Sequence, residues 1–556
     1  MATPSEKEPE ATAPLSPPPP LPPPHLHPFA GRDIRWLLES QARARGDHPM
    51  LVWEPFEGER RVFSYRALVD RIARFAAGLL ARGVGPGDRV VAHASNCPEL
   101  LIAWLGCGWI GAIACTTNAG ASEDELRYFG EKLSPVAVIA PAPLAALARK
   151  AIPQAPLFAV IGGSAGAADI PGAIDFAEID AEPQTLSPGP VDSLSPFSIQ
   201  FTSGTTARPK GVVWTHANAL FAAKVNAEHQ GLQPDDAHLV YMPLFHTNAQ
   251  AWASLACIWV GATIVLTPKL SVSRFWDISL RNRCTWTMSV AMLVQGLSAQ
   301  PVPQHHYRMW GGGQASPPSD ARLGVRTIGW WGMTETLVSA TVGDRLLPNP
   351  PGVMGRPSTS YRFRIVDEDG RDLPPGEVGE LRVGGQRGLS LFLEYYGDPE
   401  ATAAAFDEAG YFRTGDRVSV RPDGYLVFAD RAKDMLKVGG ENVSAAEVER
   451  VLYQVPGVAE AAVVARRDPV RDEVPVAFLV LAPGEHPDAV RAAAEAACAA
   501  QLAPFKRPVE YRAAGALPRG VGSKILKAEL RRFLALELEA GVTAPNYDVW
   551  VRQFAI

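Results

Sequence analysis

Apolar positions over the first two thirds of the chain alternate between helical and strand spacing. Within residues 65–82 they recur at helical spacing, at Leu68, Ile72, Phe75, Ala76 and Leu79. A short apolar run at 89–94 follows a turn and predicts a buried strand. The alternation continues with strands at 136–140, 157–161, 237–241 and 262–266 and helices at 216–228 and 248–259. This order predicts α/β architecture with helices on both faces of the sheet.

The pattern changes beyond Pro350, where short strands are separated by Gly, Pro and Asp turns. We expect these strands at 361–367, 379–383 and 425–428. From about Ala432 the sequence predicts a helix at 445–454, strands at 460–465 and 474–481, a helix at 487–502, and a last strand and helix. This mixed order is typical of a small α+β unit.

Composition fits a globular protein of several domains. The chain has 556 residues, 47% hydrophobic and 20% charged, which is long enough for two or three packed cores. A net charge of −6 gives no broad attraction to nucleic acid or to an anionic membrane. The six cysteines are scattered and form no C-x-x-C pair, which argues against a disulfide framework or a zinc site and favours a reducing cytoplasm.

Neither end of the chain predicts a packed structure. Residues 1–24 are mainly Pro, Glu, Ala and Ser and lack the basic start and apolar middle of a signal peptide. We expect a disordered Pro-rich tail over residues 1–30 and a second tail at 541–556. The longest uncharged apolar stretch, residues 101–115, is too short for a membrane span, so we expect a buried helix and strand there.

The stretch Ser198–Gly211 carries the first chemical signal. An apolar lead runs into small and polar residues and then a lysine: Thr202, Ser203, Gly204, Thr205, Thr206 and Lys210. A strand that ends in such a loop offers hydroxyls, backbone N–H groups and one cation to a single anion, which suits a polyphosphate. The spacing is not that of a standard P-loop. Taken alone, the stretch fits a flexible Gly/Thr surface turn equally well.

Five motifs in a fixed order then point to a family. They are Phe201–Gly211, Trp331–Glu335, Tyr411–Asp416, Asp430–Asp434 with Gly439–Val443, and Leu517–Lys524. With them the chain resembles the adenylate-forming (AMP-binding) superfamily, in its acyl-CoA synthetase branch, over roughly residues 35–535. The resemblance implies a large N-terminal adenylation domain, residues 31–431, with two α/β sheets and a β-rich subdomain. It also implies a small mobile α+β C-terminal domain, residues 432–540.

The resemblance also implies how ATP is held. The loop from Thr202 to Thr206, with Lys210, would bind the β- and γ-phosphates. In the Trp331–Glu335 motif the tryptophan would stack on adenine, Thr334 would donate to the α-phosphate, and Glu335 would bind Mg²⁺. Gly313, Gln314, Gly332 and Met333 would complete the nucleotide site. From the residues alone, Thr334 and Glu335 also fit a helix N-terminus, and Trp331 fits a core aromatic.

Residues after position 411 are expected to contact the ribose, move and bind the thiol. By resemblance, Asp416 and Arg431 bind the ribose, Lys433 is the hinge, and Lys524 is the catalytic lysine that meets the carboxylate and the α-phosphate. The CoA contacts implied are Lys437, Gly439 and Gly440. Without the resemblance, Asp416 is an ordinary turn residue and Lys433 a solvated charge. Lys527 competes with Lys524 for the catalytic role and is otherwise a solvated surface charge.

The acyl pocket is expected around the motif Pro243–His246, which resembles the family's substrate-lining segment. The expected pocket residues are Phe245, His246, Asn248, Trp252, Trp310, Gly311 and Gly312. His246 would lie where the acyl and thiol tunnels meet, as a catalytic residue, against the alternative of a core histidine. Residues 245–248 include no carboxylate that could pair with a substrate amine. Only fifteen residues separate Ala315 from Trp331, which suggests a shortened pocket wall. We therefore expect a bulky apolar acid.

The expected function is an ATP-dependent carboxylic acid:CoA ligase. It would form an acyl-adenylate with release of pyrophosphate, then transfer the acyl group to CoA with release of AMP, using ATP, Mg²⁺ and CoA. A carrier-protein-loading adenylation enzyme, a luciferase-like oxygenase and an inactive binding relative are the alternatives. The full set of Lys210, Glu335, Asp416, Arg431 and Lys524 argues against the last. A cytoplasmic enzyme is expected, and an acyl carrier protein partner and a homodimer stay open.

Overall fold

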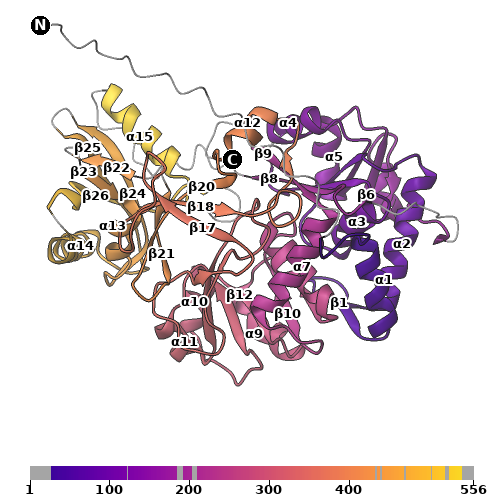
Figure 1. Ribbon diagram of the computed structural model, residues 1–556, viewed down its shortest axis with the longest axis horizontal. Helices are drawn as coiled ribbons and strands as arrows, with labels where there is room; N and C mark the ends of the chain where they lie inside the picture. Colours follow the sequence, from indigo (N-terminus) through magenta and orange to yellow (C-terminus); the bar gives the residue numbers. More distant parts are fainter. Residues whose placement is uncertain are drawn as a thin grey trace, which may run out of the picture.

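The structure is a computed structural model. It describes residues 27–540, apart from Ser122, 184–191, 203–208, 432–434, 439–440, 469–470, Ala503 and 520–524. Two unequal parts are visible: a large one drawn from indigo to orange and a smaller one in yellow tones (Figure 1). This arrangement confirms the predicted class, a large α/β region followed by a smaller α+β domain.

The first sheet of the large part has nine strands in the order β16-β15-β14-β13-β12-β10-β11-β1-β2. The strands from β14 to β1 are all parallel to their neighbours. Their bounds are β1 Pro49–Trp53, β2 Arg61–Ser64, β10 Ala237–Val240, β11 Thr263–Leu266, β12 Trp286–Ser289, β13 Met309–Gly312, β14 Arg326–Trp331, β15 Thr341–Val342 and β16 Arg356–Pro357. Helices α9 (Val272–Arg281), α10 (Ala291–Ser298) and α11 (Pro317–Leu323) connect them.

The second sheet has eight strands in the order β19-β9-β8-β4-β3-β5-β6-β7. Their bounds are β3 Arg89–His93, β4 Ile113–Thr117, β5 Ala137–Pro141, β6 Leu157–Ile161, β7 Ile174–Asp175, β8 Pro196–Thr202, β9 Lys210–Thr215 and β19 Glu394–Tyr395. Helices α4 (Glu123–Leu133), α5 (Ala142–Ala151) and α6 (Gly163–Ala168) accompany it. β8 and β9 form an antiparallel hairpin whose tip is the predicted phosphate loop.

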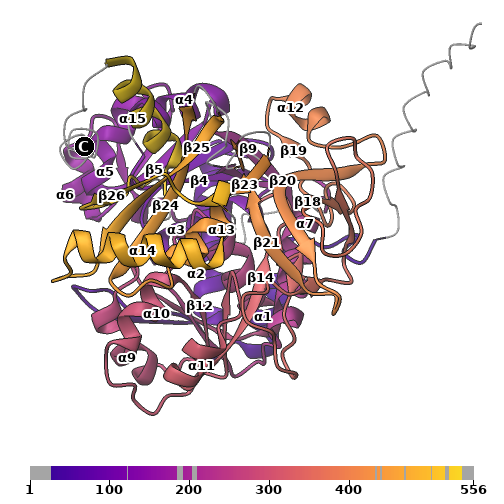
Figure 2. The same cartoon turned by 90° about the vertical axis from the view of Figure 1, so that its left-hand side faces the viewer.

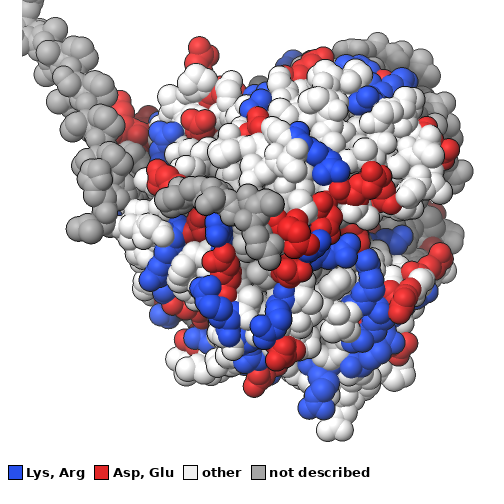
Figure 3. Space-filling model, turned by 90° about the vertical axis from the view of Figure 1, so that its right-hand side faces the viewer, with Lys and Arg blue, Asp and Glu red and all other residues white. Residues whose placement is uncertain are grey.

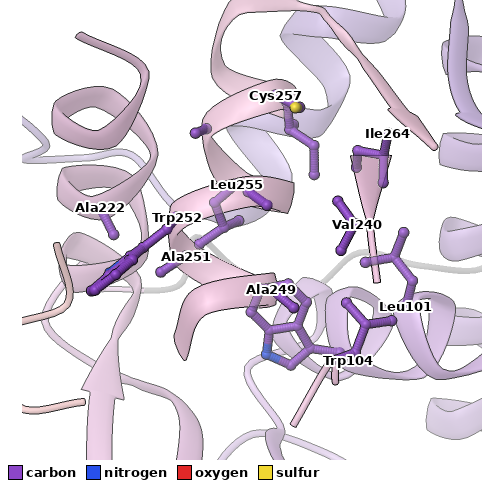
Figure 4. Packing of buried hydrophobic residues seen from close by; sticks show 14 of the residues in the cluster. Leu101, Trp104, Ala222, Val240, Ala249, Ala251, Trp252, Leu255, Cys257 and Ile264 are labelled. Carbon is purple, nitrogen blue, oxygen red and sulfur yellow. The ribbon is translucent and has the colours of Figure 1, made fainter. Parts of the chain in front are cut away.

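Apolar helices pack together with strands of both sheets in the main core. They are α1 (Ile34–Arg45), α2 (Tyr65–Ala81), α3 (Pro98–Trp109), α7 (His216–Gln230), the π-helix η3 (Asn248–Leu255) and α8 (Ala256–Val260). Every residue of α3 from Leu100 to Trp109 is buried, because an apolar surface on all sides of a helix requires packing on all sides. Figure 4 shows Leu101 and Trp104 of α3 close to Ala249 of η3 and Val240 of β10.

The β-rich subdomain is a four-stranded sheet in the order β17-β18-β20-β21. Its strands are β17 Arg362–Val366, β18 Gly379–Gly384, β20 Tyr411–Val420 and β21 Leu426–Arg431, with α12 (Pro399–Ala404) beside them. The C-terminal sheet contains β22 Met435–Val438, β23 Glu441–Ser444, β24 Val458–Asp468, β25 Asp472–Leu481 and β26 Glu510–Ala514. Helices α13 (Ala445–Leu452) and α14 (Pro487–Gln501) pack in one apolar cluster and α15 (Lys527–Ala540) in another (Figure 2).

Several bounds shift by a few residues, and two larger differences from the sequence-based expectations lie near the predicted site. The helix expected at 248–259 begins as a π-helix and becomes α-helical only at Ala256. The segment around Asp416 is not a turn, because it lies inside the ten-residue strand β20. No helix among the described residues is long and apolar enough to cross a membrane. On the face in Figure 3, acidic and basic side chains are interspersed.

Candidate active site

A cavity of about 760 Å³ lies at the carboxyl ends of three neighbouring strands, β12, β13 and β14. The last residue of each strand lines it: Ser289, Gly312 and Trp331. The other lining residues are Val294, Ser298, Gly313, Gln314, Ser316, Ser319, Trp330, Met354 and Phe428. Open parallel sheets bind ligands at this edge, because the loops that leave the strands there can surround a ligand without breaking the sheet.

Four residues expected at the nucleotide and acyl sites line this cavity: Gly312, Gly313, Gln314 and Trp331. Gly311 does not line the cavity. Its α-carbon faces the Trp330 ring instead, at so short a distance that an added Cβ would lie 2.0 Å from the ring. Trp310 is wholly buried, with its ring centroid 5.6 Å from Phe275 and 5.3 Å from Tyr307. The Trp310 ring thus packs on core aromatic rings, and its place in the acyl pocket stays a prediction.

Glu335 lies in a group of polar side chains from three separate elements. The Tyr395 hydroxyl of β19 donates to Glu335 Oε1 at 2.9 Å, and the Lys210 ammonium of β9 lies 4.7 Å above the Tyr395 ring centroid. Glu335 is 4% exposed and Tyr395 is 6% exposed. Burial and the neighbouring Glu335 carboxylate raise the pKa of Tyr395 well above its usual range, so the phenol remains a hydrogen-bond donor.

Strand pairing explains why these residues meet. β19 joins the edge of the second sheet next to β9, with Tyr395 opposite Val212. The Phe392 backbone N–H also donates to the Glu335 carbonyl at 2.9 Å, which ties the segment before β19 to the loop after β14. A carboxylate, a phenol and an ammonium group are thereby held near the end of the β8–β9 hairpin, where Thr202 and Lys210 flank the predicted phosphate loop.

Asp416 and Trp331 contact each other across two sheets. The indole Nε1 of Trp331 donates to Asp416 Oδ2 at 2.8 Å, and Asp416 is 2% exposed. Asp416 points there because Gly415, at φ +68°, accompanies an irregularity in the pairing of β18 with β20. Asp416 lies opposite Arg431 of β21, the second expected ribose contact. The Trp331 ring is therefore held at its edge while it lines the cavity.

Thr334 is fixed from two sides. Its carbonyl accepts from Trp214 Nε1 of β9 at 2.9 Å, and its hydroxyl lies 3.2 Å from the Thr247 hydroxyl. Trp214 belongs to the second sheet, whereas Thr247 follows β10 of the first. Thr334 thus contacts residues of both large sheets.

The residues expected at the acyl pocket fall into two groups. Phe245 and His246 are half-buried with ring centroids 4.3 Å apart, and burial lowers the pKa of His246 to about 4, so its imidazole is neutral at pH 7. Asn248 begins the π-helix and is also half-buried. Trp252 is a core residue, because its Nε1 donates to the Leu337 carbonyl at 3.0 Å and its ring extends toward α7 (Figure 4).

Comparisons with known proteins agree on one family. The model of the AMP-binding enzyme family matches residues 38–396, and that of the AMP-binding enzyme C-terminal domain matches residues 447–524. The chain belongs to the AMP-binding enzyme family. It is 36% identical to the crotonobetaine/carnitine–CoA ligase of Salmonella paratyphi C, over 90% of this chain and 99% of that protein.

Solved structures of AMP-binding enzymes share the fold. The anthranilate CoA ligase AuaEII in complex with anthranoyl-AMP is 26% identical, with a TM-score of 0.83 over 93% of this chain and 99% of that chain. The Bacillus subtilis o-succinylbenzoate CoA synthetase in complex with ATP and magnesium is 25% identical, with a TM-score of 0.73 over 89% and 98%. The predicted class, an AMP-forming acyl-CoA synthetase, is confirmed. The ATP, magnesium and CoA of these related enzymes agree with the predicted cofactors ATP, Mg²⁺ and CoA.

Several residues expected at the site of this AMP-binding enzyme lie outside the described residues: Ser203, Gly204, Thr205, Thr206, Lys433, Gly439, Gly440 and Lys524. The side chains of Arg431 and Lys437 are likewise not described. Thr202 and Lys210, which flank the loop, pair with each other in the hairpin. Lys527 is not a solvated charge, because its Nζ lies 2.9 Å from Glu449 Oε1 and its side chain is 14% exposed.

The described residues fit a magnesium ion that arrives with a nucleotide. Among them, no group of three or more His, Cys, Asp or Glu side chains could hold a metal by itself. Mg²⁺ at nucleotide sites is usually held by one or two carboxylates and the substrate phosphates. Glu335, buried and aligned by Tyr395, provides one such carboxylate at the base of the expected phosphate loop.

Proposed function

We propose that the protein is an ATP-dependent carboxylic acid:CoA ligase that acts in two steps. A carboxylate oxygen attacks the α-phosphate of ATP, the bond to pyrophosphate breaks, and an acyl-adenylate forms. The CoA sulfur then attacks the acyl carbon, the bond to AMP breaks, and the thiol loses its proton. The observation that carries the proposal is that Glu335, Tyr395 and Lys210 form one group, while Trp331, four residues before Glu335 and bonded to Asp416, lines the cavity.

The described side chains have separate tasks in the first step. Trp331 offers its face to adenine, and Asp416, held by the Trp331 indole, offers its carboxylate edge to the ribose hydroxyls. Lys210 is placed to neutralise phosphate charge, and Thr334 to donate to the α-phosphate. Mg²⁺ at Glu335 would disperse charge over the phosphate oxygens when bound. Roles for the loop 203–206, Arg431, Lys433, Lys437, Gly439, Gly440 and Lys524 follow the family resemblance.

The substrate class is inferred from the segment expected at the acyl pocket. Among the described residues 245–248 of that segment, none is Asp, Glu, Lys or Arg. Such a site does not compensate a second charge on the substrate, because burying an unpaired charge is costly. Phe245 and the neutral His246 extend an apolar, uncharged surface near the reaction centre. We therefore propose a bulky hydrophobic acid whose only charge is the reacting carboxylate.

The acceptor and the cellular setting are part of the same proposal. We assign CoA as the acceptor because the relatives named above are CoA ligases, and we assign domain alternation because one arrangement cannot present both Lys524 and a thiol to one carbonyl. All six cysteines are free thiols, which supports a reducing compartment such as the cytoplasm.

The test is ATP–pyrophosphate exchange with a panel of fatty, aryl and polycyclic acids, including carnitine, anthranilate and benzoate. We expect exchange with apolar monoacids, weak exchange with dicarboxylic or cationic acids, and acyl-CoA formation once CoA is added. A folded Glu335→Ala variant serves as the inactive control, because it lacks the metal-binding carboxylate. Absence of exchange with every acid would refute the proposal, and exchange without acyl-CoA formation would refute the acceptor.

A further inference from the structure

A chain of buried polar side chains runs from the core of the second sheet to Thr334. Gln250 Nε2 donates to Thr116 Oγ1 at 3.0 Å, and Gln200 Nε2 donates to Gln250 Oε1. The Thr247 hydroxyl then lies 2.8 Å from Gln200 Oε1 and 3.2 Å from Thr334 Oγ1. The chain thus crosses from β4 and β8 in one sheet to the loops after β10 and β14 in the other.

These groups are as buried as the hydrophobic core. Thr116 is 2% exposed, Gln200 1%, Gln250 0% and Thr247 7%. Burying amide and hydroxyl groups in place of apolar ones costs free energy unless every group finds a partner. Packing alone would be satisfied by leucine or methionine at positions 200 and 250. A purely structural role therefore explains why the two amides pair with each other. It does not explain why the series of hydrogen-bonded side chains ends at Thr334, a residue of the expected site.

The backbone supplies the geometry of this chain. Gln250 lies in the π-helix η3, in which the wider turn changes the direction of side chains relative to an α-helix. The Ser254 hydroxyl donates to the Ala249 carbonyl five residues earlier at 2.6 Å, which supports that turn. The wide turn and the position of Gln200 in β8 bring the two amides together behind Thr247.

The Thr247 hydroxyl has two neighbours but only one proton. Gln200 Oε1 can only accept a hydrogen bond. When the Thr247 hydroxyl donates to Gln200 Oε1, its own oxygen can only accept from the Thr334 hydroxyl. Thr334 must instead donate to the α-phosphate during adenylation, and its oxygen then becomes an acceptor. Rotation of the Thr247 proton from Gln200 to Thr334 satisfies that oxygen and polarises the Thr334 hydroxyl toward the phosphate.

We propose that Thr247, backed by Gln200, is a positioning residue that orients the Thr334 hydroxyl for adenylation. The inference rests on the proposed function and deepens it, since it adds a residue that acts through Thr334 without touching the substrate. The charge on the α-phosphate oxygens changes most in the transition state, so the effect falls on kcat more than on KM.

The test compares Thr247→Val, which keeps the shape and removes the hydroxyl, with Thr247→Ser, which keeps it. Thr287→Val is the matched control, because Thr287 is also fully buried and its hydroxyl donates to the Leu239 carbonyl at 2.9 Å, away from this chain. We expect Thr247→Val to lower kcat for pyrophosphate exchange by about tenfold, the size of one neutral hydrogen bond, with KM for ATP changed less than about twofold. Thr247→Ser and Thr287→Val should stay within about threefold of wild type.

A double variant separates positioning from stability. In the Thr334→Val background, Thr247→Val should add no further loss, because the group through which it acts is gone. A full further loss there, no rescue by serine, or equal losses at positions 247 and 287 would each overturn the inference. If Thr247→Val does not fold, Thr247→Ala is assayed with the same expectations. A wild-type protein without exchange for any acid refutes the proposed function itself, and this inference with it.

Discussion

The most informative single change is Tyr395→Phe, which removes one hydroxyl beside Glu335, the carboxylate that we propose binds Mg²⁺. The phenyl ring stays, so its packing on Phe392, at 4.8 Å between ring centroids, and its face under the Lys210 ammonium, at 4.7 Å, are retained. Only the hydrogen bond from Tyr395 to Glu335 Oε1 is lost. The variant therefore isolates the effect of aligning that carboxylate.

The size of the effect follows from the charge and burial of Glu335. A hydrogen bond to a charged group contributes about 1.5–3 kcal/mol, and Glu335 is buried enough for water to be a poor replacement. If alignment acts through the metal, this corresponds to a weakening of Mg²⁺-dependent steps by about 10- to 150-fold. Partners that hold metal ligands in place commonly produce losses of this order when removed.

The assay is pyrophosphate exchange as a function of free Mg²⁺, together with ATP binding measured with and without the metal. We expect Tyr395→Phe to need more Mg²⁺ for half-maximal exchange and to bind metal-free ATP as wild type does. Tyr396→Phe is the matched control, because this neighbouring tyrosine packs against the apolar cluster of the second sheet. A Mg²⁺ requirement within about twofold of wild type would refute the role of Tyr395.

Three further predictions test the proposed catalytic role of Lys524, the proposed hinge at Lys433 and the buried histidines. Lys524→Ala should lower adenylation by on the order of 10² or more while thioester formation from supplied acyl-adenylate stays near wild type; a defect in Lys527→Ala instead would contradict this assignment, since Lys527 pairs with Glu449. Lys433→Pro should permit adenylation and block thioester formation, because proline fixes φ; equal loss of both half-reactions would contradict the hinge. Burial lowers the pKa of His93 and His238 to about 4 and of His216 to about 3. Below about pH 6.5 the unfolded chain binds these protons, whereas the folded chain does not. The free energy of unfolding should therefore decrease as the pH is lowered from about 6.5 to the folded pKa, by up to about 1.4 kcal/mol per histidine for each pH unit. An unfolding midpoint unchanged between pH 7 and pH 5 would contradict it.

Hydrophobic periodicity predicted the helices and strands correctly where one regular face of the segment is buried. The strand expected at 157–161 has those bounds, and the helix expected at 65–82 ends one residue earlier. Prediction failed where one residue changes the local backbone. Thr-Gly-Asp reads as a turn, but Gly415, at φ +68°, lies within a strand instead, and this is how Asp416 reaches Trp331.

The sequence predicted site residues only within the recognised motifs. The Trp331–Glu335 motif pointed to the segment beside the cavity, yet nothing near Glu335 in sequence signals Tyr395, sixty residues away. Trp310 was expected at the pocket through its resemblance to the family's substrate segment, and nothing in that segment signals that Phe275 and Tyr307, from other elements, pack on its ring. Gln200 and Gln250 were missed in the sequence analysis, although a polar amide within an otherwise buried segment requires a partner and could have pointed to them.

These successes and failures have one physical cause, which is that the site belongs to no single element. Its groups come from the carboxyl ends of β8, β10 and β14, from the edge strand β19 and from β20, an inner strand of the β-rich subdomain. Each motif fixes its own backbone locally, whereas the distances between motifs depend on how two sheets pack over one core. The bonds that join the motifs, from Tyr395 to Glu335, Trp331 to Asp416 and Thr247 to Thr334, hold that packing at the site. Changes at Tyr395 and Thr247 should therefore alter catalysis while the motifs themselves stay intact.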